Sequence, residues 1–355
     1  MVALAMKAGG FYDSHSKGQA NVIRNAHGLI TGAMETVPLP APGMPFTIVD
    51  YGCSEGKNSL SAVGYIIDNV RSRRAGQAVV AFHNDIPQNN FNALCSHFLE
   101  PDYLAMKSAG PLFSFAAPGS FFEQVMPDDS VHFGISTSAA HWLSGDCTGA
   151  VREHVHHLYA TVVEQNYFAE IASRDWSAFL RARAAEMRSG GKMVVSFQAN
   201  NTEANKTTIG NPYVKAFDLI SKAVLQLVDE NVISREGYYR LAFPIYCRTL
   251  AEVRAPFDNE LRGVLNLDHV EPALMTIPIR EQFECDGNVE DYVCELIPQI
   301  RAWSEPVIRH ALQLDPKDAA IIEQIYSRME SLVRDDPYDT LSGRVMIWYL
   351  VFSKR

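Results

Sequence analysis

Apolar residues along the chain fall into two kinds of run, short continuous runs and longer periodic ones. Short runs typical of buried strands lie near residues 47–51, 78–83, 112–117, 131–136 and 192–198. Helix-like periodic runs separate the first four of them, and a last apolar run spans residues 344–352. This alternation predicts an α/β fold with a Rossmann-like, doubly wound, mostly parallel sheet that the last run closes.

The rest of the chain is mainly helical in pattern. Residues 150–185 and 205–235 are typical of helices, and the first 45 residues predict loops with one helix near residues 19–30. A chain of 355 residues exceeds the usual size of one compact domain. We therefore expect an α/β core at residues 1–145, 186–200 and 340–355. A mainly helical cap is expected at residues 146–185 and 201–339, with part of 238–270 rejoining the core.

A glycine-bearing turn follows the first predicted strand, in residues 50–58 (DYGCSEGKN). Gly52 and Gly56 allow positive φ or a close approach of the backbone to a ligand. The turn lacks the G-x-G-x-x-G pattern of dinucleotide sites and the G-K-[ST] ending of phosphate loops. Asp50 disfavours a pyrophosphate and favours a cationic or amine-bearing ligand, and S-adenosylmethionine fits because it carries a sulfonium and an amino group. The alternative is a purely structural turn.

Three later segments carry further candidate ligand contacts at strand ends. Asp85 follows the second strand, where an acidic side chain accepts hydrogen bonds from ribose hydroxyls in nucleotide-binding sheets, although an ordinary Asx turn is the alternative. After the third strand, Ser120 and Phe121 are candidates to contact adenine or ribose, but Phe121 alone is more typical of a core aromatic residue. After the fourth strand, the indole N–H of Trp142 is suited to orienting a carboxylate.

Composition and charge exclude several classes of protein. The net charge of −10 disfavours a nucleic-acid partner, because phosphate binding needs a basic face. No apolar run approaches the roughly 18 residues that span a bilayer, so no membrane partner is expected. Six cysteines without CxxC spacing indicate reduced thiols and a cytoplasmic protein.

Histidines offer one candidate metal site that we do not adopt. His154 and His157 are three residues apart on a predicted helix, a spacing that can bind a metal. No third ligand is evident nearby, so a solvated helix face is the preferred interpretation, and no metal is expected.

Taken together, the motifs resemble the SABATH family of S-adenosylmethionine-dependent methyltransferases. This family methylates small carboxylic acids and, in one branch, xanthine nitrogens. The similar segments occur in the family's order: residues 12–19 (YDSHSKGQ), 50–58 (DYGCSEGKN), 84–92 (NDIPQNNFN), 119–122 (GSFF), 141–144 (HWLS), 243–246 (FPIY) with 252–253 (EV), and 301–306 (RAWSEP).

The resemblance implies a role for each matching residue. Gln19 and Trp142 would donate hydrogen bonds to a substrate carboxylate and aim one oxygen at the methyl carbon. The cofactor site would be lined by Ser16, Asp50, Gly52, Asn58, Asp85, Ile86, Ser120, Phe121 and Ser136. The substrate pocket would include Tyr12, Ser138, His141 and Phe217. Ser138 stands where many plant members carry a tyrosine, so the acyl pocket is expected to differ in shape.

The expected activity is O-methylation of a small, mostly apolar carboxylic acid (aromatic, indolic or similar) by in-line displacement. No general base is needed, because a carboxylate is already ionised at neutral pH. Two alternatives stay open: N-methylation of a xanthine-like heteroaromatic ring, and a protein that binds the cofactor without turnover. The resemblance also implies a homodimer.

Overall fold

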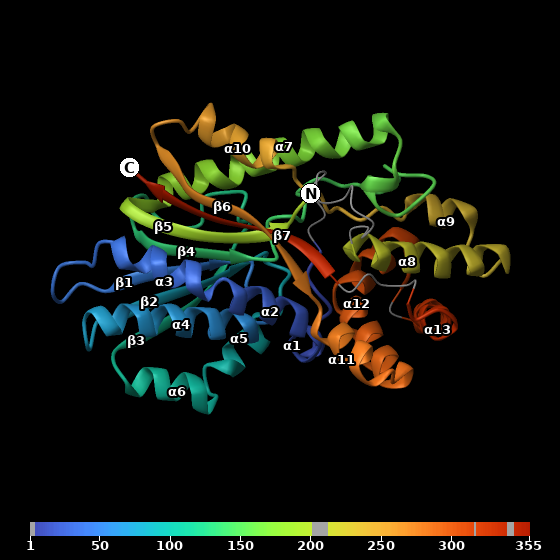
Figure 1. Cartoon of the computed structure of the whole chain (residues 1–355), viewed down its shortest axis with the longest axis horizontal. Coiled ribbons are helices and arrows are strands. Elements are labelled where there is room, and N and C mark those ends of the chain that lie inside the picture. The colour runs from blue at the N-terminus through green and yellow to red at the C-terminus, as the bar shows by residue number, and fades with distance from the viewer. Residues whose placement is uncertain (1–3, 201–211, 316, 339–343) are drawn as a thin grey trace.

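The computed structural model describes residues 4–200, 212–315, 317–338 and 344–355. The described strands form one sheet in the order β3-β2-β1-β4-β5-β7-β6 (Figure 1). Neighbours among β1 to β5 pair in parallel, whereas β7 is antiparallel to both β5 and β6. The predicted α/β fold with a mostly parallel sheet is confirmed. The strands are β1 (Phe46–Tyr51), β2 (Val79–Asp85), β3 (Leu112–Pro118), β4 (Val131–Thr137), β5 (Met187–Gln198), β6 (Leu265–Thr276) and β7 (Arg344–Lys354).

Helices cover both faces of this sheet, which makes it doubly wound. On one face, α4 buries Val63, Ile67 and Val70, whose spacing suits one side of a helix, against Ile48 of β1. The N-terminal helices α2 and α3 complete this layer. The helices of the N-terminal part of the chain are α1 (Phe11–His15), α2 (Lys17–Asn25), α3 (His27–Thr36), α4 (Lys57–Arg73), α5 (Phe91–His97) and α6 (Pro101–Ser108).

The opposite face is covered by α7 (Val162–Glu186) and α10 (Leu250–Asp258). Trp176 and Phe179 of α7 pack on the sheet with Val195 of β5. A capping box fixes the start of α7, since Thr161 and Glu164 each satisfy a backbone N–H of the first turn. Helix α7 lies within the range expected for the cap, yet its apolar side belongs to the core of the sheet. The other predicted boundaries between core and cap stay predictions.

A separate helical layer lies beyond one end of the strands (Figure 1). Its buried residues, among them Val224, Ile300 and Met329, pack mainly on one another and form a core of their own. The helices are α8 (Pro212–Asp229), α9 (Arg235–Arg240), α11 (Pro278–Asp286), α12 (Val289–Leu312) and α13 (Ala319–Asp335), and a 3-10 turn, η1 (His157–Tyr159), precedes α7. Among the described helices, none combines the length and apolar character needed to cross a bilayer.

Two local expectations were wrong, and one strand was missed. The helix expected near residues 19–30 is divided between α2 and α3, with Ala26 between them. Strand β6 was not predicted, because its many exposed, polar positions and Pro272 suit an edge strand that lacks an apolar signature. Strand β7 does not close the sheet, because β6 pairs with its outer side.

One buried ion pair ties α7 to the sheet. Arg183 and Glu186 are fully buried, and the guanidinium donates to both carboxylate oxygens, at 2.8 and 2.9 Å. Glu186 also accepts the Tyr51 hydroxyl at the end of β1 and the backbone N–H of Val125 and of Met126. The carboxylate thus joins α7, β1 and the loop after β3.

We predict that Glu186→Gln lowers the free energy of unfolding by about 3 kcal/mol, because it leaves the buried Arg183 charge without its partner. Urea unfolding measures this change. Glu260→Gln is the matched control: Glu260 follows α10 and pairs with the exposed Arg181 of α7, so the expected loss is about 1 kcal/mol or less. Equal losses in the two variants would show that burial of the Arg183 pair does not matter.

Candidate active site

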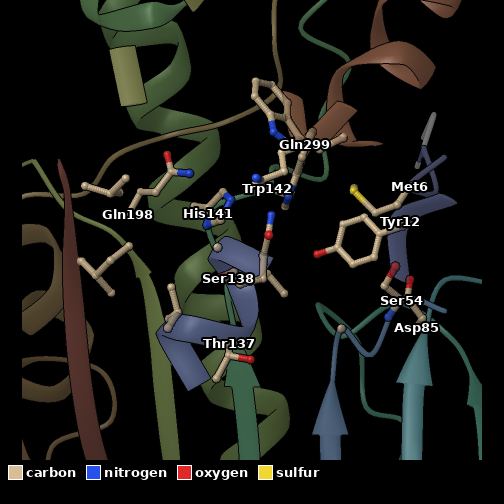
Figure 2. A pocket seen from close by; sticks show the side chains of 18 of the residues that line it. Met6, Tyr12, Ser54, Asp85, Thr137, Ser138, His141, Trp142, Gln198 and Gln299 are labelled. Carbon is tan, nitrogen blue, oxygen red and sulfur yellow. Dashed lines mark hydrogen bonds between the residues drawn. The ribbon is translucent and has the colours of Figure 1, made fainter. Parts of the chain in front are cut away.

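A cavity lies at the carboxyl ends of the parallel strands, beneath the cap helices (Figure 2). Its walls come from the turns after β1 to β4, the end of β5, helices α2 and α12, and the N-terminal segment at residues 4–6. Such a crevice is the usual ligand site of an open α/β sheet. The predicted site residues that line it are Tyr12, Gln19, Gly52, Asp85, Ile86, Ser120, Phe121, Ser138, His141 and Trp142.

Four residues predicted to bind the cofactor do not line the cavity: Ser16, Asp50, Asn58 and Ser136. Asn58 donates from Nδ2 to Ser16 Oγ at 2.8 Å, and this bond joins the start of α4 to the corner between α1 and α2. Ser136 is fully buried and donates to the carbonyl of Tyr51 at 2.8 Å. Asp50 is buried beneath the glycine turn. The contacts expected of these residues with a cofactor stay predictions.

Phe217, predicted in the substrate pocket, belongs to the core of the cap. Its ring packs against Phe243 and Trp303 with centroid distances of 4.9 and 5.3 Å. Trp303 and Ala216 line the cavity, whereas Phe217 does not. Its role in substrate binding also stays a prediction.

The glycine turn after β1 packs directly on the loop after β4. Gly52 has φ +95°, and a Cβ there would lie 2.4 Å from the Cβ of Ala139. Gly56 has φ +112°, and a Cβ there would lie 2.5 Å from a side-chain carbon of Leu94. Both positions require glycine for conformation and for space. The turn is therefore held close to the loop that carries His141 and Trp142.

Two carboxylates stand beneath this turn, the buried Asp50 and the half-buried Asp85. Asp85 accepts the backbone N–H of Ser54 at 2.6 Å and that of Ile86 at 2.8 Å. Burial raises the pKa of Asp85 to about 6. Burial, with a smaller contribution from Asp85, raises the pKa of Asp50 to about 7. Both groups would gain from a nearby positive charge.

Residues 244–248 hold the backbone of residues 140–144 in place. Trp142 forms an isolated β-bridge with Ile245, and the N–H of Leu143 donates to the carbonyl of Pro244 at 2.8 Å. The buried Arg248 guanidinium donates to the carbonyl of Ala140 at 2.8 Å. These bonds hold the backbone of Trp142 in place.

The cavity offers neutral hydrogen-bond donors and little charge. Among the described residues, neither the Gln19 amide nor the Trp142 indole N–H has a hydrogen-bond partner, and both side chains line the cavity. Asp85 is the one charged residue of the described lining, which contains no Lys or Arg. An anionic ligand group would thus be held by neutral donors, and a cationic one would meet Asp85.

The sequence profile of the S-adenosylmethionine-dependent carboxyl methyltransferases matches residues 3–355. The chain belongs to this family. The methyltransferase is 29% identical over 297 residues to a salicylate carboxymethyltransferase of Clarkia breweri. The aligned residues cover 81% of this chain and 79% of the relative. It is also 29% identical over 257 residues to a loganic acid O-methyltransferase of Catharanthus roseus, covering 66% of each chain.

A solved structure supports the fold of the methyltransferase. A loganic acid methyltransferase determined with SAH superimposes with a TM-score of 0.79 at 22% identity, covering 99% of both chains. The predicted family, enzyme class and S-adenosylmethionine cofactor are confirmed by these comparisons. The glycine turn and the Asp85 carboxylate fit such a cofactor, because they provide close backbone approach and a negative charge for a cation.

His141 is a neutral residue of the methyltransferase cavity. Burial lowers its pKa to about 3, and the Arg248 charge contributes. The imidazole is therefore uncharged at any working pH and has one donor and one acceptor nitrogen. It neither attracts an anion by charge nor serves as a reservoir of protons near neutrality.

Sequence reasoning missed several residues of the cavity wall. Ser54, Asn89, Gln198 and Gln299 line it, and Asn89 donates to the carbonyl of Ser54 at 2.6 Å. A signal existed for Gln198, since it is a polar residue at the carboxyl end of a predicted strand, where ligands bind. Gln299 lies in the middle of α12, where only the packing of the cap reveals its position.

The histidine segment before α7 is not the predicted solvated helix face. Residues 150–156 are not helical, and His157 is buried at the start of η1. His156, His157 and Cys247 place ligand atoms within 4.8 Å of one another. His156 Nδ1 and His157 Nε2 each accept a backbone N–H, so these two lone pairs are engaged within the protein.

We predict that Asp50→Asn stabilises the ligand-free methyltransferase above pH 7 and has little effect near pH 4. The folded pKa of about 7 exceeds the ordinary 3.8, so the folded state binds the proton more tightly and loses stability as pH rises from 4 to 7. The gain at pH 8 is at most about 4 kcal/mol. Thermal melts at pH 4, 6 and 8 measure it, and an equal effect at all three values would contradict the assignment.

Proposed function

We propose that this methyltransferase converts a small, mostly apolar carboxylic acid, aromatic, indolic or similar, to its methyl ester. One observation carries the proposal: Gln19 and Trp142 present N–H donors without protein partners to a cavity that borders the glycine turn. The rest of the described lining is largely apolar, with residues such as Met275, Ile300 and Ile347. Relatives that are named for salicylate and loganic acid support an acid as substrate.

The reaction is an in-line displacement for which the chain supplies position. S-adenosylmethionine, when bound, supplies the methyl group as an electrophile. Gln19 and Trp142 hold one carboxylate oxygen and turn the other toward the glycine turn. A carboxylate is ionised at neutral pH, so the chain does not need to remove a proton. Rate acceleration of this kind comes mainly from proximity and orientation.

Neutral donors suit this chemistry better than cations. The negative charge of the carboxylate is lost as the ester forms, so a Lys or Arg partner would stabilise the ground state more than the transition state. The absence of Lys and Arg from the described lining agrees with this requirement.

The cofactor half of the cavity is assigned to residues around the glycine turn. Asp85 would accept the ribose hydroxyls, Phe121 would contact the adenine face, and Asp50 with Asn58 would hold the methionine end. The raised pKa values of both carboxylates support a cationic ligand beside them. The edge-on contact of Phe121 with Phe179, at 5.8 Å between centroids, supports a fixed orientation of its ring.

The two alternatives predict different products. N-methylation of a xanthine-like ring is not favoured, because the matching profile is that of carboxyl methyltransferases and the relatives reported above are named for acids. A cofactor-binding protein without turnover would have no need for the two donors at Gln19 and Trp142. We further propose a cytoplasmic homodimer: six unpaired cysteines support the location, and the exposed Phe113 and Phe115 of edge strand β3 support an apolar contact surface.

A transfer screen tests the proposed function. Labelled S-adenosylmethionine is offered with aromatic, indolic, fatty and terpenoid acids and with xanthines. We expect label in a base-labile methyl ester. Label in a base-stable product would favour N-methylation, and tight cofactor binding without transfer to any compound would favour the protein without turnover.

We predict that Trp142→Phe lowers kcat/KM for the acid about 10- to 100-fold, because it removes one hydrogen bond to a charged group and keeps the aromatic ring. Gln19→Glu should lower kcat/KM further, since it places a second negative charge beside the carboxylate. Calorimetry should give an unchanged cofactor Kd for both variants. Full activity of Trp142→Phe would remove the indole N–H from the proposed site.

A further inference from the structure

A second polar position in the cavity is formed by Gln198, the last residue of β5. Gln198 pairs with Ile347 of β7, is only 4% exposed and lines the cavity. Figure 2 shows its amide nitrogen turned toward His141, which lies between Gln198 and Trp142. The Gln198 side chain is thus separated by His141 from the proposed carboxylate site.

A hydrogen bond from Cys247 fixes the orientation of the Gln198 amide. The thiol of Cys247 donates to Gln198 Oε1, with 3.6 Å between sulfur and oxygen. Burial raises the pKa of Cys247 to about 12, so the thiol keeps its proton and remains a donor. The amide oxygen is therefore occupied. No described residue accepts a hydrogen bond from Nε2, which leaves the N–H groups of the amide for a ligand in the cavity.

The imidazole of His141 is a second group beside this amide that lacks a hydrogen-bond partner among the described residues. Neither of its ring nitrogens has a hydrogen-bond partner among the described residues, and the side chain lines the cavity. A hydroxyl group can accept from the amide and donate to an imidazole nitrogen at the same time. A carbonyl group satisfies the amide alone.

The energetic consequence concerns the substrate. A purely hydrocarbon group at this position would bury the Gln198 amide without a partner, which costs about 1–3 kcal/mol. A second carboxylate is disfavoured as well, because the described lining has no Lys or Arg to balance its charge. A neutral oxygen is the group that matches this position.

We propose that Gln198 determines substrate specificity by binding a neutral oxygen, hydroxyl or carbonyl, remote from the reacting carboxylate. The substrate class is thus an oxygenated monocarboxylic acid. This inference rests on the proposed function, because it assumes that the carboxylate binds at Gln19 and Trp142. Gln198 does not touch the reacting atoms, so it selects the acid and leaves the displacement itself unchanged.

The test compares acids that differ by one remote hydroxyl group. Suitable pairs are cinnamic and 4-hydroxycinnamic acid, and indole-3-acetic and 5-hydroxyindole-3-acetic acid. We expect kcat/KM to favour the hydroxylated acid about fivefold or more in at least one pair. Gln198→Leu, which has a similar size, should abolish this preference. Gln299→Leu is the matched control, since it alters another lining glutamine, beside Trp142, and should change both acids of a pair alike (Figure 2).

The outcomes separate this inference from the proposed function. Methyl transfer without a preference in either pair, or a preference that Gln198→Leu preserves, overturns the inference and leaves the esterification intact. Dissociation constants of the same acids with the protein saturated by S-adenosylhomocysteine provide a readout without turnover. A preference in binding that is lost in Gln198→Leu, with no transfer to any acid, supports the role of Gln198 and overturns the proposed function.

Discussion

The close contact between Gly52 and Ala139 is the constraint on which the rest of the site depends. It is possible only because β1 and β4 are neighbours in the sheet and because residue 52 has neither a side chain nor a negative φ. The contact sets the turn that faces the cofactor against the loop that carries Trp142. Since displacement requires the two reactants to meet within a few ångströms, this backbone contact determines the geometry before any ligand arrives.

The two sides of the cavity differ in electrostatic character. Beside the cofactor turn, the buried Asp50 and the half-buried Asp85 have raised pKa values and favour a cation. Around the proposed acid site, the donors are neutral, and His141 is held uncharged by burial and by Arg248. The chain thus places carboxylates beside the cationic cofactor. It places neutral groups beside the substrate carboxylate, whose charge is lost during the reaction.

The sequence predicted the parallel part of the sheet because its strands are continuous apolar runs with glycine or proline at their ends. It could not predict β6, whose edge position tolerates polar residues, or the packing of α7 on the sheet, which depends on residues of β5. For the site, the motifs that resemble the family predicted the cavity residues between Tyr12 and Trp142. Gln198 and Gln299 stand in no motif, and their position depends on how β5 and the cap helix α12 meet the cavity.

The two carboxylates beneath the glycine turn also affect how long the protein persists. Asp50 is buried and Asp85 is half-buried, so water solvates neither carboxylate fully and the ligand-free fold is less stable than its packing alone would allow. A cationic cofactor offsets this cost and stabilises the folded state by mass action. Unfolded chains are removed by proteases in cells. The abundance of the methyltransferase should therefore follow the supply of its cofactor, so that a shortage reduces the amount of enzyme as well as its rate.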